Sequence, residues 1–255
     1  MAIRVQTEFI MSKTWVLGVV LFAVAWTAPA QISRIDTRPR GAATSSFSIG
    51  PRLASYSTDF SAGTSFETGR QTGFGLVGDY RSGQFVLDFM WDHDPENGFS
   101  LTDIIVDTGN YERDRGEATI GYAIAPIVDL QGGIRFDNIR VGGASFFGNP
   151  FGTEFEVEHQ AITAGVRLHT GEGNPVGWYG VARGYLGSAN FDVAGLDRDP
   201  DTTGFRLETG VSIRLGDSAW SAVPGFEYER IETEEDFGLE LDTNRVFVNF
   251  VYRMR

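Results

Sequence analysis

The chain of 255 residues contains no cysteine, only three histidines and a single lysine, Lys13. The missing thiols exclude a disulfide-stapled domain and a thiolate metal site. Because 34 acidic residues outnumber 21 basic ones, the formal net charge is −13, and we expect no nucleic-acid partner. The 32 glycines and the aromatic content of 13% are also unlike a disordered tail.

The sequence lacks an apolar run long enough for a spanning helix. The run Trp15–Trp26 near the amino terminus covers 12 residues, short of the ~20 that a helix needs to cross a bilayer. It follows Lys13 and precedes Ala28-Pro29-Ala30, a small-x-small pattern typical of signal cleavage. We therefore predict a cleaved signal peptide over residues 1–30, starting at Met1 or Met11. A short periplasmic segment over residues 31–45 then precedes the folded domain.

The rest of the chain shows the two-residue period of β-strands. Over residues 203–215, Phe205 and Val211 fall on one face, while Arg206 and Glu208 fall on the other. A mean hydropathy of −0.14 is compatible with a membrane barrel, because alternating strands average out. The pattern predicts ten strands, over residues 46–56, 72–81, 84–92, 116–125, 127–139, 157–170, 177–188, 203–215, 219–230 and 244–254.

The predicted connections alternate between tight and long. Those near residues 81–83, 125–126, 171–175 and 216–218 are tight, and those near 57–71, 93–115, 140–156, 189–202 and 231–243 are long. Short periplasmic turns and longer external loops are typical of outer-membrane barrels. We predict an all-β fold over residues 46–255, a closed antiparallel transmembrane β-barrel of about ten strands. The alternative is eight strands with one hairpin folded over the mouth.

Aromatic residues fall in two bands along these strands, as expected of residues at the two membrane interfaces. One band lies near the tight turns: Tyr80, Phe85, Trp178, Trp220 and Tyr252. The other lies toward the long loops: Phe74, Trp91, Phe136, Phe205 and Tyr228.

The signal peptide, the alternating turn lengths and the last strand, Arg245–Arg255, resemble small outer-membrane β-barrels of Gram-negative bacteria, the OmpA-like and opacity-type group. The resemblance covers about residues 45–255. It implies an outer-membrane location, contact with membrane lipid and lipopolysaccharide, and insertion by the barrel-assembly machinery. In this group the machinery recognises alternating apolar residues that end on an outward aromatic. Here Arg255 stands at the end, and the alternation is supplied by Val246, Val248, Phe250, Tyr252 and Met254.

Charged residues of both signs are expected inside the barrel. Seven arginines and eight carboxylates nearly cancel, and Arg183 is expected to join them, because a charge facing lipid is unfavourable. Ten strands enclose a narrow interior, which these side chains either fill as an ion-pair network or line as a narrow pore. The predicted residues are Arg52, Arg81, Arg135, Arg167, Arg206, Arg214 and Arg253, with Asp79, Asp88, Asp92, Glu117, Asp129, Glu208, Glu227 and Glu229.

Two motifs resemble ligand sites. Gly73–Gly78 matches G-x-G-x-x-G, but it lies inside an alternating strand and lacks the helix that would receive a pyrophosphate. Asp197, Asp199 and Asp201 partly match a calcium loop and are a candidate divalent-metal site. Thr202 replaces the glycine of that loop, so a solvated acidic loop is the favoured interpretation.

The three histidines do not form a convincing catalytic set. His93 lies between Asp92 and Asp94, whereas His159 and His169 are expected to face inward at opposite ends of one strand. We therefore predict no enzymatic activity and no cofactor. The expected function is a passive outer-membrane barrel, either a narrow porin-like pore or a plugged structural barrel. The alternative is a surface binding protein or adhesin that acts through acidic external loops, and the sequence leaves the oligomeric state open.

Overall fold

The computed structural model describes residues 45–61, 65–99, 109–142, 145–146, 149–150, 155–170, 175–193, 196–234 and 238–254. The predicted signal peptide and residues 31–44 lie outside these ranges. Among the described residues, no helix is long and apolar enough to cross a membrane.

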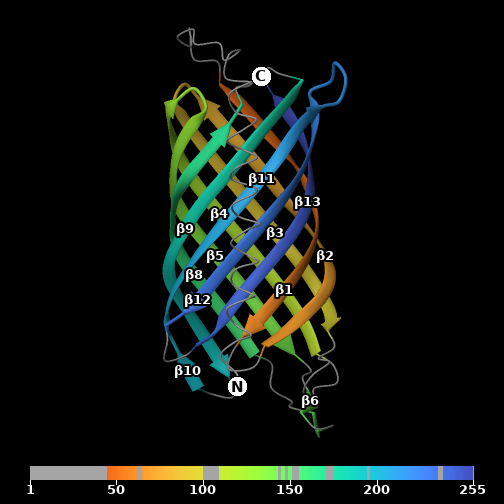
Figure 1. Cartoon of the computed structure of the whole chain (residues 1–255), viewed down its shortest axis with the longest axis vertical. Coiled ribbons are helices and arrows are strands. Elements are labelled where there is room, and N and C mark those ends of the chain that lie inside the picture. Colours follow the sequence, from red (N-terminus) through yellow and green to blue (C-terminus); the bar gives the residue numbers. More distant parts are fainter. Residues whose placement is uncertain are drawn as a thin grey trace, which may run out of the picture. The chain divides into compact units, whose positions relative to one another are not determined.

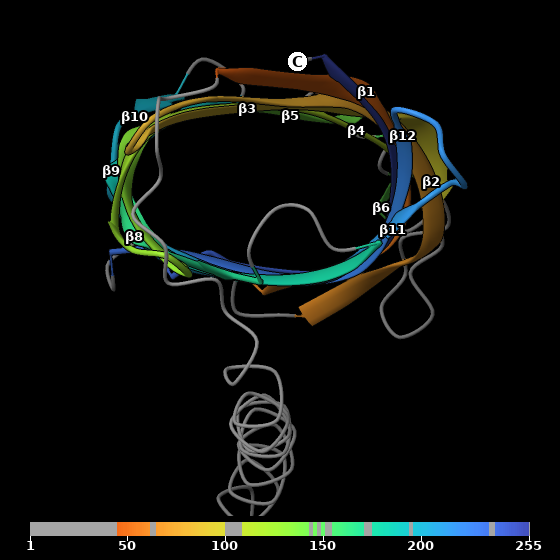
Figure 2. The same ribbon diagram turned by 90° about the horizontal axis from the view of Figure 1, so that it is seen from above.

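Ten long strands form one closed antiparallel barrel (Figures 1 and 2). Each strand pairs with the next long strand of the chain, and β1 pairs with β13 to complete the ring. This confirms the ten-stranded barrel and excludes the eight-stranded alternative. The strands are β1 (Ser46–Ser61), β2 (Ser65–Ser82), β3 (Phe85–Phe99), β4 (Gly109–Ala125), β5 (Val128–Gly142), β8 (Phe155–His169), β9 (Val176–Val193), β11 (Asp201–Arg214), β12 (Trp220–Thr233) and β13 (Glu240–Met254).

Three short strands lie outside this ring of ten. β6 (Ser145–Phe146) pairs with β7 (Asn149–Pro150), and β10 (Leu196–Arg198) pairs with the end of β9. All three lie in the connections where the sequence predicted long loops.

Tight turns gather at the end of the barrel that also holds the carboxyl terminus, at the top of Figure 1. Gly83 and Gln84 join β2 to β3, and Pro126 and Ile127 join β4 to β5. Gly83 has a φ of 60°, a left-handed conformation that favours glycine. We call this the short-turn end.

At the opposite, long-loop end the strands run further than the sequence predicted. β1 continues to Ser61 rather than residue 56, and β2 begins at Ser65 rather than residue 72, so their connection is residues 62–64. β3 likewise continues to Phe99. Most of the predicted long loop 57–71 is therefore strand, and that prediction was wrong.

The strand lengths were missed because the hydrophobic pattern inverts along the barrel. Near the middle of β1, Leu53 is 53% exposed on the outer face while Arg52 is buried inside. Further along the same strand, Tyr56 and Phe60 are buried inside. Apolar residues face outward where the surroundings are lipid and inward where they are water. We call these parts the membrane zone and the outer zone.

Aromatic side chains mark both edges of the membrane zone. At the short-turn end, Tyr80, Phe85, Trp220 and Tyr252 are exposed on the outer face. Trp178 is half-buried there and donates from Nε1 to Thr209 Oγ1 at 3.0 Å. Toward the outer zone, the exposed aromatic residues are Phe74, Trp91, Phe136 and Phe205, and Tyr228 packs against Phe205 with ring centroids 5.7 Å apart.

Candidate functional site

The barrel lumen is the candidate site, and its inward side chains form three layers. An apolar cluster occupies the outer zone, charged residues form a layer below it, and a polar cavity opens toward the short-turn end. We call these the outer apolar core, the ion-pair layer and the cup.

The outer apolar core is built from seven of the ten strands. Phe60 on β1 packs edge-to-face against Tyr111 on β4, with ring centroids 5.5 Å apart. Contributions from most of the ring mean that the cluster extends across the lumen. Its buried members are Tyr56, Phe60, Tyr111, Ile139, Val157, Ala189, Phe191, Ile231 and Leu241.

The ion-pair layer contains equal numbers of positive and negative groups. Five arginines face five carboxylates, so the formal charges cancel (5 − 5 = 0), and all ten residues are buried. Such burial is tolerated only where each charge has a close partner of opposite sign. The members are Arg52, Arg113, Arg115, Arg135, Arg245, Asp92, Asp94, Asp137, Glu227 and Glu229.

Ion pairs in this layer join opposite walls of the barrel. Arg113 Nη2 lies 2.7 Å from Glu229 Oε1, and Arg115 Nη1 lies 2.6 Å from Glu227 Oε1. The arginines are on β4 and the glutamates on β12, and β4 is the fifth strand after β12 in the ring of ten. Charged side chains from opposite walls therefore meet across the lumen at this level.

Further contacts connect the ion-pair layer to its neighbours. The Arg135 guanidinium lies 4.5 Å from the Tyr185 ring centroid, a cation–π arrangement. His159 Nδ1 lies 3.0 Å from Asp137 Oδ2, and its Nε2 lies 3.0 Å from Thr202 Oγ1. His159 thus fills space between the charges and the outer apolar core.

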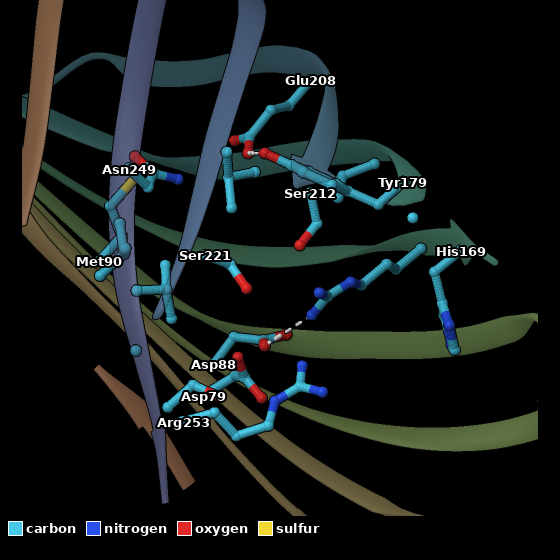
Figure 3. A pocket seen from close by; sticks show the side chains of 18 of the residues that line it. Asp79, Asp88, Met90, His169, Tyr179, Glu208, Ser212, Ser221, Asn249 and Arg253 are labelled. Atoms are coloured by element: carbon cyan, nitrogen blue, oxygen red, sulfur yellow. Dashed lines mark hydrogen bonds and ion pairs between the residues drawn. The ribbon is translucent and has the colours of Figure 1, made fainter. Parts of the chain in front are cut away.

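The cup is a polar cavity of about 620 Å³, lined by residues near the short-turn end (Figure 3). Arg167 Nη1 pairs with Asp88 Oδ1 at 2.9 Å, and the Tyr179 hydroxyl donates to Glu208 Oε1 at 2.7 Å. Arg167 and Asp88 are partly exposed, with side-chain exposures of 22% and 16%. These charges differ from the ion-pair layer in that they have access to solvent.

All the arginines and carboxylates predicted to face inward do face the lumen. Arg183 also faces inward and pairs with Glu117, which lies 2.8 Å from Arg206. Arg214 lines the cup. Those in or beside the cup are Asp79, Arg81, Asp88, Asp129, Arg167, Glu208, Arg214 and Arg253.

Sequence reasoning missed half of the ion-pair layer. Arg113 and Arg115 precede the predicted start of their strand, yet they keep the inward phase of Glu117. Asp137 and Arg245 lie within predicted strands, in phase with Arg135 and Arg253, and were overlooked. Asp94 follows Asp92 in phase on β3. If every second residue had been counted as inward beyond the stretch with apolar outward residues, all five would have been found.

The histidines occupy three different environments. His93 faces outward, away from Asp92 and Asp94, and its Nδ1 lies 2.9 Å from Asp114 Oδ1. His159 and His169 are both buried in the lumen, and His169 Nε2 lies 3.3 Å from Asp129 Oδ2 near the cup.

The remaining sequence motifs fall on the barrel wall or outside the described side chains. Gly73–Gly78 lies within β2. Asp199 and Asp201 are exposed, whereas the side chain of Asp197 lies outside the described residues. On β13, the alternating residues of the expected assembly signal point outward: Val246, Val248, Phe250, Tyr252 and Met254.

Comparison with solved structures gives similarity to outer-membrane β-barrels. No protein-family model and no curated protein matches the chain. Neisserial surface protein A is 17% identical, with 81% of this chain and 96% of that chain covered and a TM-score of 0.37. The attachment invasion locus protein of Yersinia pestis is 13% identical over 83% and 100%, with a TM-score of 0.35. The translocator domain of the autotransporter NalP from Neisseria meningitidis is 12% identical over 91% and 98%, with a TM-score of 0.48.

Proposed function

We propose that this protein is a plugged, non-conducting barrel of the bacterial outer membrane, with its short turns in the periplasm and its outer zone outside the cell. The observation that carries the proposal is the bridging of opposite walls by Arg113–Glu229 and Arg115–Glu227. Of the two expected states of the lumen, this geometry supports the filled one over the narrow pore.

Two further features support a closed lumen. The outer apolar core lines its part of the lumen mainly with aliphatic and aromatic side chains, which are unfavourable surroundings for an ion. An ion that entered the cup would meet guanidinium and carboxylate groups already paired with each other, and displacing them would leave buried charges uncompensated. The cup then serves as a periplasmic vestibule that ends at the ion-pair layer.

Conductance in a planar bilayer tests this proposal. Refolded protein is expected to be silent at several voltages, with folding confirmed by its heat-dependent gel shift. A triple variant, Arg113→Ser, Tyr111→Ser and Glu229→Ser, removes large side chains from both the ion-pair layer and the outer apolar core. It is expected to give discrete conductance steps. Steps of similar size from the unaltered protein would overturn the plugged-barrel proposal and restore the pore.

A surface-binding role is the second candidate, favoured by the length of the outer zone. On β3, the strand continues from Trp91 in the aromatic band to Phe99. Eight residues at about 3.3 Å each, tilted by about 40°, rise about 20 Å above the membrane. A rigid extension of this height would present external loops to a partner. If this role is real, deleting matched pairs of residues from the outer-zone ends of β3 and β4 should abolish cell-surface adhesion but preserve membrane insertion.

A further inference from the structure

A group of three metal-binding residue types lies on the outside of the barrel wall, where the membrane zone meets the outer zone. His93 on β3 and Glu112 and Asp114 on β4 place one ligand atom each within 4.8 Å of one another. His93 and Asp114 are directly paired in the ladder, and Glu112 lies two residues away on the same face. We propose that this rim cluster binds a divalent transition-metal ion, for which zinc is the probe.

The ligand types favour zinc over the harder cations. Imidazole nitrogen with two carboxylate oxygens suits zinc and its neighbours, whereas calcium and magnesium prefer oxygen ligands alone. Zinc–ligand distances of about 2.0–2.2 Å in a tetrahedron place ligand atoms about 3.4 Å apart, so the cluster, whose ligand atoms lie within 4.8 Å of one another, needs to contract by at most about 1.4 Å. The two carboxylate side chains are partly exposed, with exposures of 42% for Asp114 and 30% for Glu112, and can make that adjustment by rotation. Three protein ligands leave an outward position open.

Aromatic neighbours fix both the orientation of His93 and its height. Its ring centroid lies 6.1 Å from that of Trp91 with an interplanar angle of 11°, and 5.1 Å from that of Phe74 in an edge-to-face arrangement. Trp91 and Phe74 belong to the aromatic band, so the rim cluster lies immediately above it. The open metal position therefore faces the headgroup layer, a placement that rests on the proposed membrane orientation.

A second outward cluster, on β12 and β13, shows what the rim cluster lacks. There Arg230 lies 3.0 Å from Glu240 and 3.9 Å from Asp242, and it also pairs with Glu232. Those carboxylates have a cation within the protein. At the rim cluster, Arg140 reaches Glu112 only at 3.9 Å and pairs more closely with Glu156, at 3.1 Å.

This difference gives the metal a role in lipid contact. The rim cluster shares its one arginine, Arg140, with Glu156, so its two carboxylates keep an excess of negative charge that would repel the phosphates of lipopolysaccharide. A divalent ion held by the rim cluster neutralises the two carboxylates and removes that repulsion, and a phosphate oxygen then completes its coordination. The ion would thus anchor this side of the barrel to the outer leaflet.

Equilibrium dialysis of the folded, full-length protein in phosphate-free detergent tests the metal site. We expect one zinc ion per chain, and at least a tenfold weaker affinity in His93→Asn and in Asp114→Asn. Glu240→Gln removes a carboxylate from the Arg230 cluster and is the matched control, expected to bind zinc unchanged. Each variant is first checked for its heat-dependent gel shift. No zinc in the unaltered protein, or unchanged affinity in His93→Asn, would overturn the site.

Bilayer discs separate the sources of phosphate. Zinc affinity is expected to rise at least threefold in discs that contain lipopolysaccharide, compared with detergent. An equal rise on adding inorganic phosphate in detergent would overturn the lipid bridge in favour of a free anion. Because zinc binding in detergent does not depend on whether the lumen conducts, failure of this experiment is distinguishable from failure of the plugged-barrel proposal.

Discussion

The membrane zone and the outer zone use the same strands with opposite side-chain patterns. On β5, Ile134 faces outward and Arg135 inward, whereas a few residues later Ile139 faces inward and Arg140 outward. The backbone ladder continues unchanged through the switch. Alternation along a strand therefore reports the medium on each face, and not whether the strand continues.

The two zones also fill their interiors by different means. The outer zone has an apolar core, as a soluble barrel does, and gains stability from burial. The membrane zone must place its polar residues inside, and ion pairs there offset the unfavourable burial of charge. The ion-pair layer lies where these two kinds of interior meet.

The largest effect is expected from breaking the ion-pair layer. Arg113→Leu leaves Asp137 and Glu229 short of a partner in a fully buried setting, which should lower the free energy of unfolding by about 3–5 kcal/mol. Arg167→Leu is the matched control, because its partner Asp88 faces the cup and keeps access to water. Urea unfolding in detergent micelles measures both. Equal losses would show that the ion-pair layer is solvated, and the lumen would then be wet throughout.

Removing a large side chain from the outer apolar core should be nearly as costly. Phe191 is buried there, and Phe191→Ala should lower the free energy of unfolding by about 3 kcal/mol through the cavity it leaves. Phe136→Ala, on the lipid face at 48% exposure, should cost less than half as much. Limited proteolysis should cut the Phe191 variant in the outer zone first. The reverse ranking would contradict a water-surrounded outer zone.

An outward arginine should distinguish the surroundings of the zones. Ile120 on β4 is 63% exposed and lies between the aromatic bands, and Ile120→Arg should cost about 2–3 kcal/mol because the charge faces lipid. Asn110→Arg, outward on the same strand in the outer zone, should change stability by less than about 0.5 kcal/mol. Reversible folding into vesicles gives both values. A large loss of stability in Asn110→Arg would mean that the membrane boundary lies several residues further toward the loops.

Sequence patterning predicted the fold well where lipid imposes a strict rule. Strand number, closure and the inward direction of residues such as Arg52 and Glu227 followed from apolar residues on every second position. It failed where the rule changes: at Arg113 and Arg115 the outward residues are already polar, so no apolar alternation remains to mark the strand. The ion pairs between β4 and β12 across the lumen depend on the circular order of the strands, which no local sequence pattern contains. The rim cluster was missed for a related reason. His93 and Asp114 are far apart in the sequence, and only the register between β3 and β4 brings them side by side.

The smallest effect is expected from an arginine of the outer zone that faces water. Arg140 lies five residues after Arg135 on β5, and its side chain is 55% exposed while it pairs with Glu156 at 3.1 Å. Exposed ion pairs contribute at most about 1 kcal/mol, and salt screens them, so Arg140→Ala should cost little and nothing measurable at 1 M salt. Arg135→Ala should retain most of its larger cost at that salt concentration, because water and ions do not reach its partners Asp137 and Glu229. A salt-insensitive loss at Arg140 would place that residue in a low-dielectric layer, and the boundary between the two zones would have to lie beyond it.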